Sequence, residues 1–220
     1  MIIITGASDG LGLQLAKLYK ESGKKVVNVS RSKCVYADVN IQCDFLDEAG
    51  IKTTTDTISE MSDEIEALIN CAGVFTNQKL GTITAEVIDR VLSINYKSQI
   101  LIVSAIIDRL KKDRTDIMNV SSTVGTKGRG GETVYSSSKW AVRGFTKSLQ
   151  EDLKDTNRVI SFCPGGFKTK FFEKGTGVDN TGDGSEWMKP EDLAIFMKQI
   201  LDLPKNMEVS EVIINRKAIK

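Results

Sequence analysis

Short apolar runs alternate along the chain with longer stretches in which apolar residues recur at helical spacing. The apolar runs have the length and composition of strands that are buried on both faces of a parallel sheet. The predicted strands are Ile2–Ile4, Val26–Val29, Val39–Asp44, Glu66–Asn70, Asp116–Val120, Arg158–Cys163 and Val209–Asn215.

Helices are predicted between these strands. We expect Thr84 to be the N-cap of the longest one and Pro190 to lie in the first turn of the last one. The predicted helices are Leu13–Ser22, Asp47–Met61, Thr84–Lys111, a helix that contains Tyr135 and ends near Leu153, and Pro190–Leu203.

Strands and helices that alternate in this way predict an α/β protein. The expected architecture is a three-layer Rossmann fold, a doubly wound parallel sheet of about seven strands with helices on both faces. Ligands of such a fold gather at the carboxyl ends of the strands. With 220 residues, the chain fits one domain, 1–220. The polar, glycine-rich stretch Lys170–Met188 is predicted to be a mobile loop or lid, which puts a substrate loop near 170–188.

Charge and leader signals exclude several classes of protein. Lys and Arg total 30, and Asp and Glu total 29, which leaves a net charge of +1. This balance argues against a general nucleic-acid or membrane-surface binder, and no apolar run has membrane-spanning length. The first residues lack a basic signal region and are expected to form a strand. No Cys-x-x-Cys motif occurs, so buried free thiols in a reducing cytoplasm are expected at Cys34, Cys43, Cys71 and Cys163.

The chain contains no histidine. This absence excludes Ser-His-Asp and Cys-His nucleophile systems and the common zinc sites. Any acid–base chemistry must therefore use Tyr, Lys, Asp, Glu or Cys, and no metal site is predicted.

Tyr135 and Lys139 stand four residues apart in a predicted helix, one turn apart on the same face. A phenol has a pKa of about 10, and a fixed ammonium beside it favours the phenolate and lowers that pKa. The pair is a candidate general acid/base. Two amphipathic residues on a solvated helix face would give the same short pattern.

A glycine loop connects the first strand to the first helix. Its sequence, Thr5-Gly6-Ala7-Ser8-Asp9-Gly10-Leu11-Gly12, suits a tight turn and the close approach of a ligand to the backbone. A strand, a glycine loop and a helix in this order place backbone N–H groups against a pyrophosphate. Nucleotide binding is therefore favoured over a tight connection without a ligand.

The second predicted strand is followed by Ser30 and Arg31. NAD-binding loops usually offer a carboxylate here for the ribose 2′-hydroxyl, whereas a guanidinium suits a 2′-phosphate. NADP is the predicted cofactor and NAD the alternative; Arg31 as an ordinary surface arginine is the competing interpretation.

Taken together, these features resemble the short-chain dehydrogenase/reductase family, in its short single-domain form, over nearly the whole chain. The residues that carry the resemblance are Thr5-Gly6-x-x-x-Gly10-x-Gly12, Asn70-x-Ala72-Gly73, Asn95, Ser122, Tyr135-x-x-x-Lys139 and Pro164-Gly165-x-x-x-Thr169.

The resemblance implies a catalytic set. Tyr135 would give a proton to the substrate carbonyl oxygen, and Lys139 would lower its pKa and hold the nicotinamide ribose hydroxyls. Ser122 would hydrogen-bond the same substrate oxygen, and Ser121 is ranked lower. Asn95 would lie in the long helix and hold a water in a proton path to Lys139.

The resemblance also implies cofactor contacts. Asp44 is expected at the adenine and Thr169 at the nicotinamide amide, while Asn70 and Gly73 resemble the adenosine-side turn. The full predicted set is Gly6, Ser8, Asp9, Gly10, Leu11, Gly12, Ser30, Arg31, Asp44, Asn70, Ala72, Gly73, Tyr135, Lys139, Pro164, Gly165, Phe167 and Thr169.

Two positions depart from the family pattern. Cys71 stands where a second Asn is frequent, and Phe167 stands where a smaller β-branched residue is usual near the nicotinamide. The last predicted strand also lacks the frequent closing glycines.

The predicted function is an NADP-preferring oxidoreductase that moves a hydride between nicotinamide and a carbonyl or alcohol carbon, with carbonyl reduction as the expected direction. An NAD-dependent alcohol dehydrogenase and a non-catalytic dinucleotide-binding regulator are the alternatives. The partner is a small molecule, and the candidate pocket residues are Phe75, Arg129, Phe171, Phe172, Trp187 and Met188.

Apolar positions between Ile100 and Ile107 cover more than one helical face. They predict a second burial partner, and hence a homodimer or homotetramer. A helix wedged in its own core is the alternative.

Overall fold

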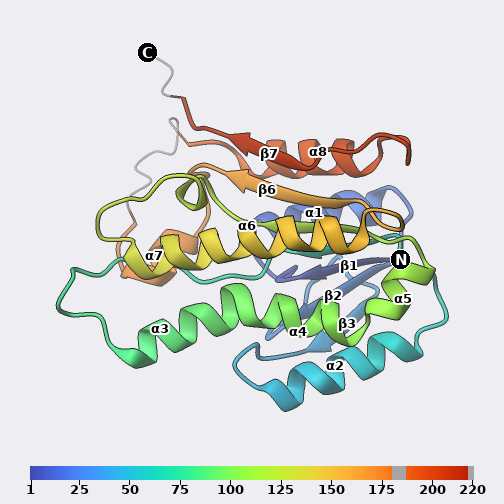
Figure 1. The fold of residues 1–220 in the computed structure, drawn as a ribbon, viewed down its shortest axis with the longest axis horizontal. Coiled ribbons are helices and arrows are strands. Elements are labelled where there is room, and N and C mark those ends of the chain that lie inside the picture. The colour runs from blue at the N-terminus through green and yellow to red at the C-terminus, as the bar shows by residue number, and fades with distance from the viewer. Residues whose placement is uncertain (180–186, 218–220) are drawn as a thin grey trace.

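A seven-stranded parallel sheet forms the centre of the part of the chain that the computed structural model describes, residues 1–179 and 187–217 (Figure 1). The strand order is β3-β2-β1-β4-β5-β6-β7, so the chain winds outward from β1 in one direction and then from β4 in the other. The strands are β1 Ile2–Thr5, β2 Val26–Ser30, β3 Val39–Gln42, β4 Ala67–Asn70, β5 Asp116–Val120, β6 Val159–Pro164 and β7 Glu211–Ile214. The predicted doubly wound fold is confirmed, and every strand lies within two residues of its predicted bounds.

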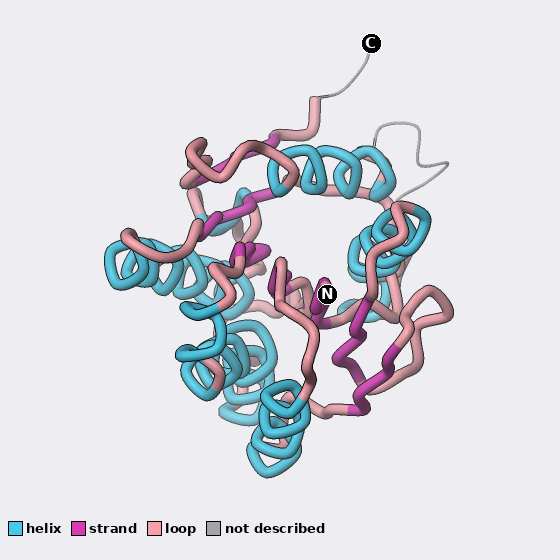
Figure 2. The backbone as a smooth tube through the Cα atoms, turned by 90° about the vertical axis from the view of Figure 1, so that its right-hand side faces the viewer, coloured by secondary structure: helices cyan, strands magenta, loops and turns pink. Residues whose placement is uncertain are grey.

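Helices cover both faces of the sheet, and Figure 2 shows the two helical layers on opposite sides of the strands. One face packs against α1, Gly10–Glu21, and α8, Pro190–Leu201. The opposite face packs against α2 Glu48–Glu60, α4 Ser98–Ala105, α5 Ile107–Lys112 and α6 Thr133–Leu153.

Strand β1 shows why the apolar runs are continuous. Ile2 and Ile4 belong to the cluster under α1 and α8, whereas Ile3 belongs to the cluster on the other face. Successive side chains of a strand point to opposite faces, so a strand with helices on both sides is apolar at every position.

The predicted helix Thr84–Lys111 is wrong as a single element. It is divided into α3, Ala85–Leu92, a π-helical turn at Ser93–Lys97, and then α4 and α5. Asn95 lies in the π turn, and its side chain pairs with the backbone of Val74: Oδ1 accepts from the Val74 N–H at 2.7 Å, and Nδ2 donates to the Val74 carbonyl at 3.0 Å. This long-range contact has no local sequence signal, and single π turns frequently occur at functional sites.

Two further details of this segment differ from a continuous capped helix. Thr84 occupies the N-cap position of α3, but its side chain makes no capping hydrogen bond. Ile106 has a φ of −114° and separates α4 from α5. Ile106 is also buried in the core, which explains why the apolar pattern continues through the break.

The predicted loop Lys170–Met188 is partly wrong. Phe171–Thr176 forms a short helix, α7, and Met188 forms a parallel bridge with Phe167. The remainder of the predicted loop includes residues 180–186, which lie outside the described residues.

The cysteine prediction is confirmed for the free thiols and for burial at three of the four positions. All four cysteines are free thiols; Cys34, Cys43 and Cys163 are buried, and Cys71 is partly exposed. In the described ranges, no helix has both the length and the apolar character that crossing a membrane requires.

Candidate active site

The predicted site residues gather at the carboxyl ends of the strands. Thr5, at the end of β1, is in register with Val29 of β2 and with Asn70 of β4. The glycine loop follows β1, and Ser122 follows β5. The parallel topology therefore brings residues that are far apart in the sequence to one edge of the sheet (Figure 1).

Two positions of the glycine loop have no room for a side chain. Gly6 has a φ of +74°, and a Cβ atom there would lie 2.9 Å from the Ala72 Cα. A Cβ atom on Gly12 would lie 2.4 Å from the Gly6 carbonyl oxygen. The Thr5 hydroxyl accepts from the N–H groups of Cys71 and Ala72, both at 3.1 Å. The loop is thereby fastened to the turn after β4, with the N-terminus of α1 beside it.

Helix α7 holds the glycine loop from another side. Its Lys174 forms an ion pair with Asp9, the N-cap residue of α1. Burial raises the pKa of Asp9, but the hydrogen bonds from Lys174 and from the Gly10 N–H outweigh burial and lower it. A Cβ atom on Gly10 would lie 3.5 Å from the Thr169 Cγ2, so Thr169 also faces the loop.

The predicted adenine-side residues lie at the ends of β2 and β3. Ser30 is buried, and its hydroxyl lies 2.7 Å from the Ser32 carbonyl oxygen and 2.9 Å from Asn28 Oδ1. Arg31 and Asp44 are exposed. The Ser30 hydroxyl is therefore engaged within the chain, and the Arg31 guanidinium is presented to solvent.

Lys139 is buried on α6, with 4% of its surface exposed. Its Nζ donates to the Val120 carbonyl at 2.9 Å and lies 5.8 Å from the centre of the Tyr135 ring. A Cβ atom on Gly73 would lie 3.7 Å from this Nζ. Burial lowers the pKa of Lys139 from 10.5 to about 8, because the ammonium is poorly solvated there.

The expected lowering of the Tyr135 pKa is not found in the structure. Burial raises the pKa of this phenol, a hydrogen bond with Ser122 opposes that rise, and the charge of Glu132 adds to it. The Lys139 ammonium donates to Val120 instead of to the phenol. Tyr135 therefore holds its proton at neutral pH.

The two candidate serines have different environments. Ser122 precedes the 3-10 turn η2, Thr123–Gly125, and its Oγ accepts from the Val124 N–H at 3.3 Å. The Ser121 hydroxyl is buried and donates to the Lys139 carbonyl at 2.8 Å. Ser122, which the sequence ranks first, is the serine that opposes the rise of the Tyr135 pKa.

The amide of Asn95 is engaged within the protein. Besides its pairing with Val74, Nδ2 donates to the Ser138 hydroxyl at 3.0 Å, and the Asn95 side chain is fully buried. From the sequence, we expected this residue to hold a water. In the structure, its side chain joins the segment after β4 to α6, near Lys139.

Three predicted pocket residues surround Tyr135. The Phe75 ring centre lies 4.9 Å from that of Tyr135, in an edge-on arrangement, and 4.9 Å from that of Phe172. The Phe171 ring lies 6.0 Å from Tyr135. Because Phe171 and Phe172 belong to α7, this helix connects the glycine loop to the tyrosine.

The other predicted pocket residues lie farther along the site. Arg129 forms an ion pair with Glu132 at 3.2 Å, just before α6. Trp187 packs on Gly166, where a Cβ atom would lie 2.6 Å from the indole ring, and Arg216 lies 4.7 Å above that ring. Gly166 is thus required by a close ring contact that the sequence did not reveal.

The remaining predicted cofactor residues keep their expected positions. Leu11 is buried in α1, Ser8 is half-buried in the loop, and Pro164 ends β6. The Gly165 N–H donates to the Ile214 carbonyl at 2.7 Å, which ties this turn to β7.

A buried polar chain beneath the site was not predicted. Asn70 Nδ2 donates to Asn119 Oδ1 at 2.8 Å, and Asn119 Nδ2 donates to the Thr146 hydroxyl at 3.0 Å. The chain joins β4, β5 and α6. Asn119 inside an apolar strand was the available signal, because buried polar groups are nearly always hydrogen-bonded.

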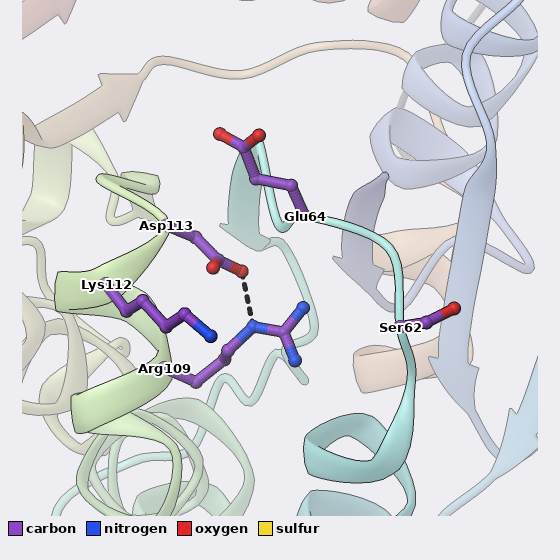
Figure 3. Close-up of a pocket in the computed structure, with 5 residues that line it drawn as sticks. All are labelled: Ser62, Glu64, Arg109, Lys112 and Asp113. Carbon is purple, nitrogen blue, oxygen red and sulfur yellow. Dashed lines mark hydrogen bonds and ion pairs between the residues drawn. The ribbon is translucent and has the colours of Figure 1, made fainter.

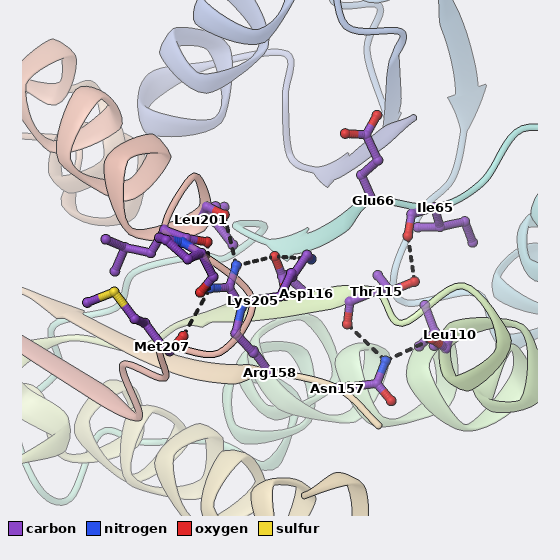
Figure 4. A network of polar contacts seen from close by, with 12 residues as sticks. Ile65, Glu66, Leu110, Thr115, Asp116, Asn157, Arg158, Leu201, Lys205 and Met207 are labelled. Atoms are coloured by element: carbon purple, nitrogen blue, oxygen red, sulfur yellow. Dashed lines mark hydrogen bonds and ion pairs between the residues drawn. The ribbon is translucent and has the colours of Figure 1, made fainter. Parts of the chain in front are cut away.

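Two pockets lie at the opposite end of the sheet, at the amino ends of the strands. One is lined by Ser62, Glu64, Arg109, Lys112 and Asp113 (Figure 3). The other has a volume of about 690 Å³ and includes Asp116 and Arg158 (Figure 4). No predicted site residue lines either pocket, so neither changes the location of the candidate site.

The carboxyl-end residues fit a nicotinamide dinucleotide. The loop at Gly6 and Gly12 leaves bare backbone beside a helix N-terminus, which suits a pyrophosphate. The Val120 carbonyl takes one of the three donors of the Lys139 ammonium, which suits ribose hydroxyls with the others. Arg31 adds an exposed guanidinium at the end of β2.

Comparisons with known proteins agree with this fit. The family model for short chain dehydrogenase matches residues 1–177. The cyclopentanol dehydrogenase of Comamonas sp. (strain NCIMB 9872) is 33% identical over 179 residues, which cover 75% of this chain and 72% of the relative.

Two solved structures share the fold. The closed form of a serine dehydrogenase complexed with NADP+ has a TM-score of 0.87 at 22% identity, with 97% of this chain and 94% of that chain covered. A 3-ketoacyl-(acyl-carrier-protein) reductase from Brucella melitensis complexed with NADH has a TM-score of 0.86 at 23% identity, with 97% and 96% covered.

Proposed function

Because the chain belongs to the short-chain dehydrogenase/reductase family, we propose that it is an NADPH-dependent oxidoreductase that reduces the carbonyl group of a small apolar molecule. The observation that carries the proposal is the Ser122 hydroxyl beside the buried Tyr135 phenol. The buried Lys139 lies one helical turn away, and the glycine loop follows β1 at the same end of the sheet. A nicotinamide bound there supplies the hydride.

Tyr135 acts as the general acid. As the carbonyl carbon receives a hydride, its oxygen gains negative charge and takes the phenolic proton, which gives the alcohol. Burial keeps the phenol protonated at neutral pH, which is the state that a proton donor needs. The Ser122 hydroxyl hydrogen-bonds the same oxygen and stabilises its developing charge. The Lys139 ammonium stabilises the phenolate that remains.

The cofactor preference rests on Arg31. Its exposed guanidinium follows β2, where a 2′-phosphate would be held, while the hydroxyl of Ser30 is already engaged. The fold neighbours described above carry NADP+ in one case and NADH in the other. An NAD-dependent alcohol dehydrogenase is the second candidate, favoured by the similarity to cyclopentanol dehydrogenase.

The substrate class is inferred from the side chains around Tyr135. Phe75, Phe171 and Phe172 form an aromatic cluster at this residue, and Phe171 and Phe172 are only half-buried. Such a surface favours alicyclic or aromatic ketones and aldehydes over charged oxo acids, because a carboxylate would lose its hydration without gaining a partner.

The deciding experiment is an activity screen of the purified protein. Ketones, aldehydes and alcohols, both apolar and charged, are tested with NADPH, NADH and the oxidised forms. We expect the fastest turnover with NADPH and an apolar carbonyl. Binding of NADPH without turnover of any compound would favour the regulator, and faster oxidation with NAD+ would favour the alcohol dehydrogenase.

We further propose that the protein is one domain that works as a homodimer or homotetramer in the cytoplasm. Trp140 on α6 is 49% exposed, and Leu101 and Ile107 are only partly buried. Four free thiols suit a reducing compartment. Light scattering at micromolar concentration tests the assembly, and a monomer would contradict it.

A further inference from the structure

Arg143 links three elements that meet behind the candidate site. It lies on α6, four residues after Lys139, and its side chain is 16% exposed. Its Nε and Nη2 donate to the two carboxylate oxygens of Glu211 on β7, at 2.7 and 2.9 Å. Its Nη1 donates to the Gly125 carbonyl at 2.8 Å, at the end of η2. One planar guanidinium thus joins α6, β7 and η2, a geometry that lysine cannot reproduce.

The turn that Arg143 contacts carries Ser122. The Ser122 carbonyl accepts from the Gly125 N–H at 2.9 Å, and its hydroxyl accepts from the Val124 N–H. A shift of Gly125 is therefore transmitted to Ser122 through two hydrogen bonds.

The same turn is pressed closely against α6. A Cβ atom on Gly125 would lie 2.7 Å from Ser121 Oγ and 2.8 Å from the Lys139 carbonyl oxygen. The Ser121 hydroxyl donates to that same carbonyl. Ser121 therefore fastens the beginning of the turn to α6, and Arg143 fastens its end.

Ser122 directly precedes η2 and Tyr135 belongs to α6, so the approach of their hydroxyl groups depends on how η2 docks on α6. We propose that Arg143 is a positioning residue: with Glu211 orienting its guanidinium, it holds the Ser122–Gly125 turn against α6 so that the Ser122 hydroxyl meets the Tyr135 phenol. The catalytic consequence rests on the proposed function, whereas the docking of the turn does not.

The ion pair of Arg143 and Glu211 is expected to persist at neutral pH. The hydrogen bonds of Glu211 raise the pKa of Arg143, and those of Arg143 lower the pKa of Glu211. Both groups therefore stay charged across the neutral range.

The protein contains a matched control at the other end of the sheet. Arg158 also makes a two-point contact with a carboxylate, to Asp116 Oδ1 at 2.9 Å and Oδ2 at 2.7 Å. Its guanidinium also donates to backbone carbonyls at and after the end of α8, among them those of Leu201 and Leu203. Figure 4 shows Arg158 within this network. Arg158 has the same chemistry as Arg143, and none of these contacts involves a residue of the candidate site.

The test compares Arg143→Met, Arg143→Lys and Arg158→Met in the full-length protein, with the best carbonyl from the activity screen. We expect Arg143→Met to lower kcat by ~10–10²-fold, since small misplacements of catalytic groups have effects of this size. The cofactor KM should change little. The basic limb of the kcat profile should move to higher pH, because the Ser122 hydroxyl that restrains the Tyr135 pKa moves away from the phenol.

Arg143→Lys should recover part of the lost kcat, because it can still donate to Gly125. Arg158→Met should lower the unfolding temperature and leave kcat and its pH profile within about twofold of wild type. Wild-type kcat and pH profile in a folded Arg143→Met protein would overturn the proposal, whatever its stability.

Amide hydrogen exchange separates this proposal from the proposed function. In Arg143→Met, the N–H groups of Val124 and Gly125 should exchange faster than in wild type and in Arg158→Met. If wild type turns over no carbonyl, the proposed function fails, and the exchange comparison alone decides whether Arg143 holds the turn. Unchanged exchange in a folded Arg143→Met protein would overturn the docking itself.

Discussion

At the amino ends of the strands, the Asp116 carboxylate receives Arg158 at two points and Lys205 at 2.8 Å. At the carboxyl ends, the Lys139 ammonium is equally buried but has the neutral Val120 carbonyl as its acceptor. The buried Asp116 carboxylate at the amino end is thus neutralised by opposite charges, whereas the acceptor of the buried Lys139 ammonium at the carboxyl end is uncharged.

This difference separates residues that stabilise the fold from residues that are suited to catalysis. At the amino end, the Asp116 carboxylate is held in ion pairs with Arg158 and Lys205. At the carboxyl end, burial raises the pKa of Tyr135 and lowers that of Lys139. Groups whose ionisation is displaced in this way are suited to proton transfer.

The largest expected effect is at Tyr135. Tyr135→Phe removes the ionisable hydroxyl and should lower kcat by ~10²–10⁴-fold, with cofactor affinity nearly unchanged. Tyr19→Phe is the control, because Tyr19 is also a buried tyrosine with a raised pKa but belongs to the core under α8. Steady-state kinetics decide the matter; a Tyr135→Phe protein with near-wild-type turnover would remove the tyrosine from the mechanism.

At the amino ends of the strands, we expect substitutions to lower the unfolding free energy instead of kcat. Asp116→Ala leaves Arg158 without its carboxylate partner, and breaking a buried pair costs roughly 3–5 kcal/mol of unfolding free energy. Urea unfolding measures this loss, and kcat of the folded variant should not change. Asp56→Ala, which removes the exposed pair with Lys52, should cost under about 1 kcal/mol. Equal losses in the two variants would contradict the comparison.

Lys139 should make stability depend on pH. Its pKa is about 8 when folded and 10.5 ordinarily, so between these values the unfolded chain binds more protons. Stability of the cofactor-free protein should therefore rise with pH over this window, by on the order of 3 kcal/mol from this group. Below pH 8 both states are protonated, and the group contributes no slope.

Urea unfolding of wild type and of Lys139→Met across this pH range isolates the contribution. In Lys139→Met, the unfolding free energy should lack the part of the rise with pH that Lys139 contributes. All other titrating groups contribute equally to both proteins. Parallel curves for the two proteins would mean that Lys139 is not destabilised by burial.

The smallest expected effect concerns cofactor choice at the carboxyl end. If Arg31 meets the 2′-phosphate, the contact contributes roughly 1.5–3 kcal/mol, or about tenfold to a hundredfold in NADPH affinity. Arg31→Ala should narrow the preference for NADPH over NADH, and Ser30→Asp should reverse it. Dissociation constants for both cofactors test this, with exposed Lys33→Ala as the control. Equal weakening of both cofactors by Arg31→Ala would end the NADP assignment.

Local patterns were sufficient to predict the sheet, the glycine loop and the Tyr135–Lys139 pair of the candidate site. A strand covered by helices on both faces must be apolar throughout, so the apolar run Ile2–Ile4 predicts a buried strand. The alternation of such strands with amphipathic stretches predicts that the strands are parallel. The glycine loop and the spacing of Tyr135 and Lys139 were readable for the same reason. Each depends on residues a few positions apart, where backbone geometry alone determines what lies together.

Only the tertiary structure decided the features that depend on distant neighbours. The π turn at Asn95 forms against Val74, the α7 helix packs on Phe75, and Arg143 finds Glu211 across 68 positions of the sequence. The raised pKa of Tyr135 likewise comes from burial, which no spacing encodes. Desolvation and long-range hydrogen bonds arise when separate segments pack together, so the chemical state of the site was set by the fold as a whole.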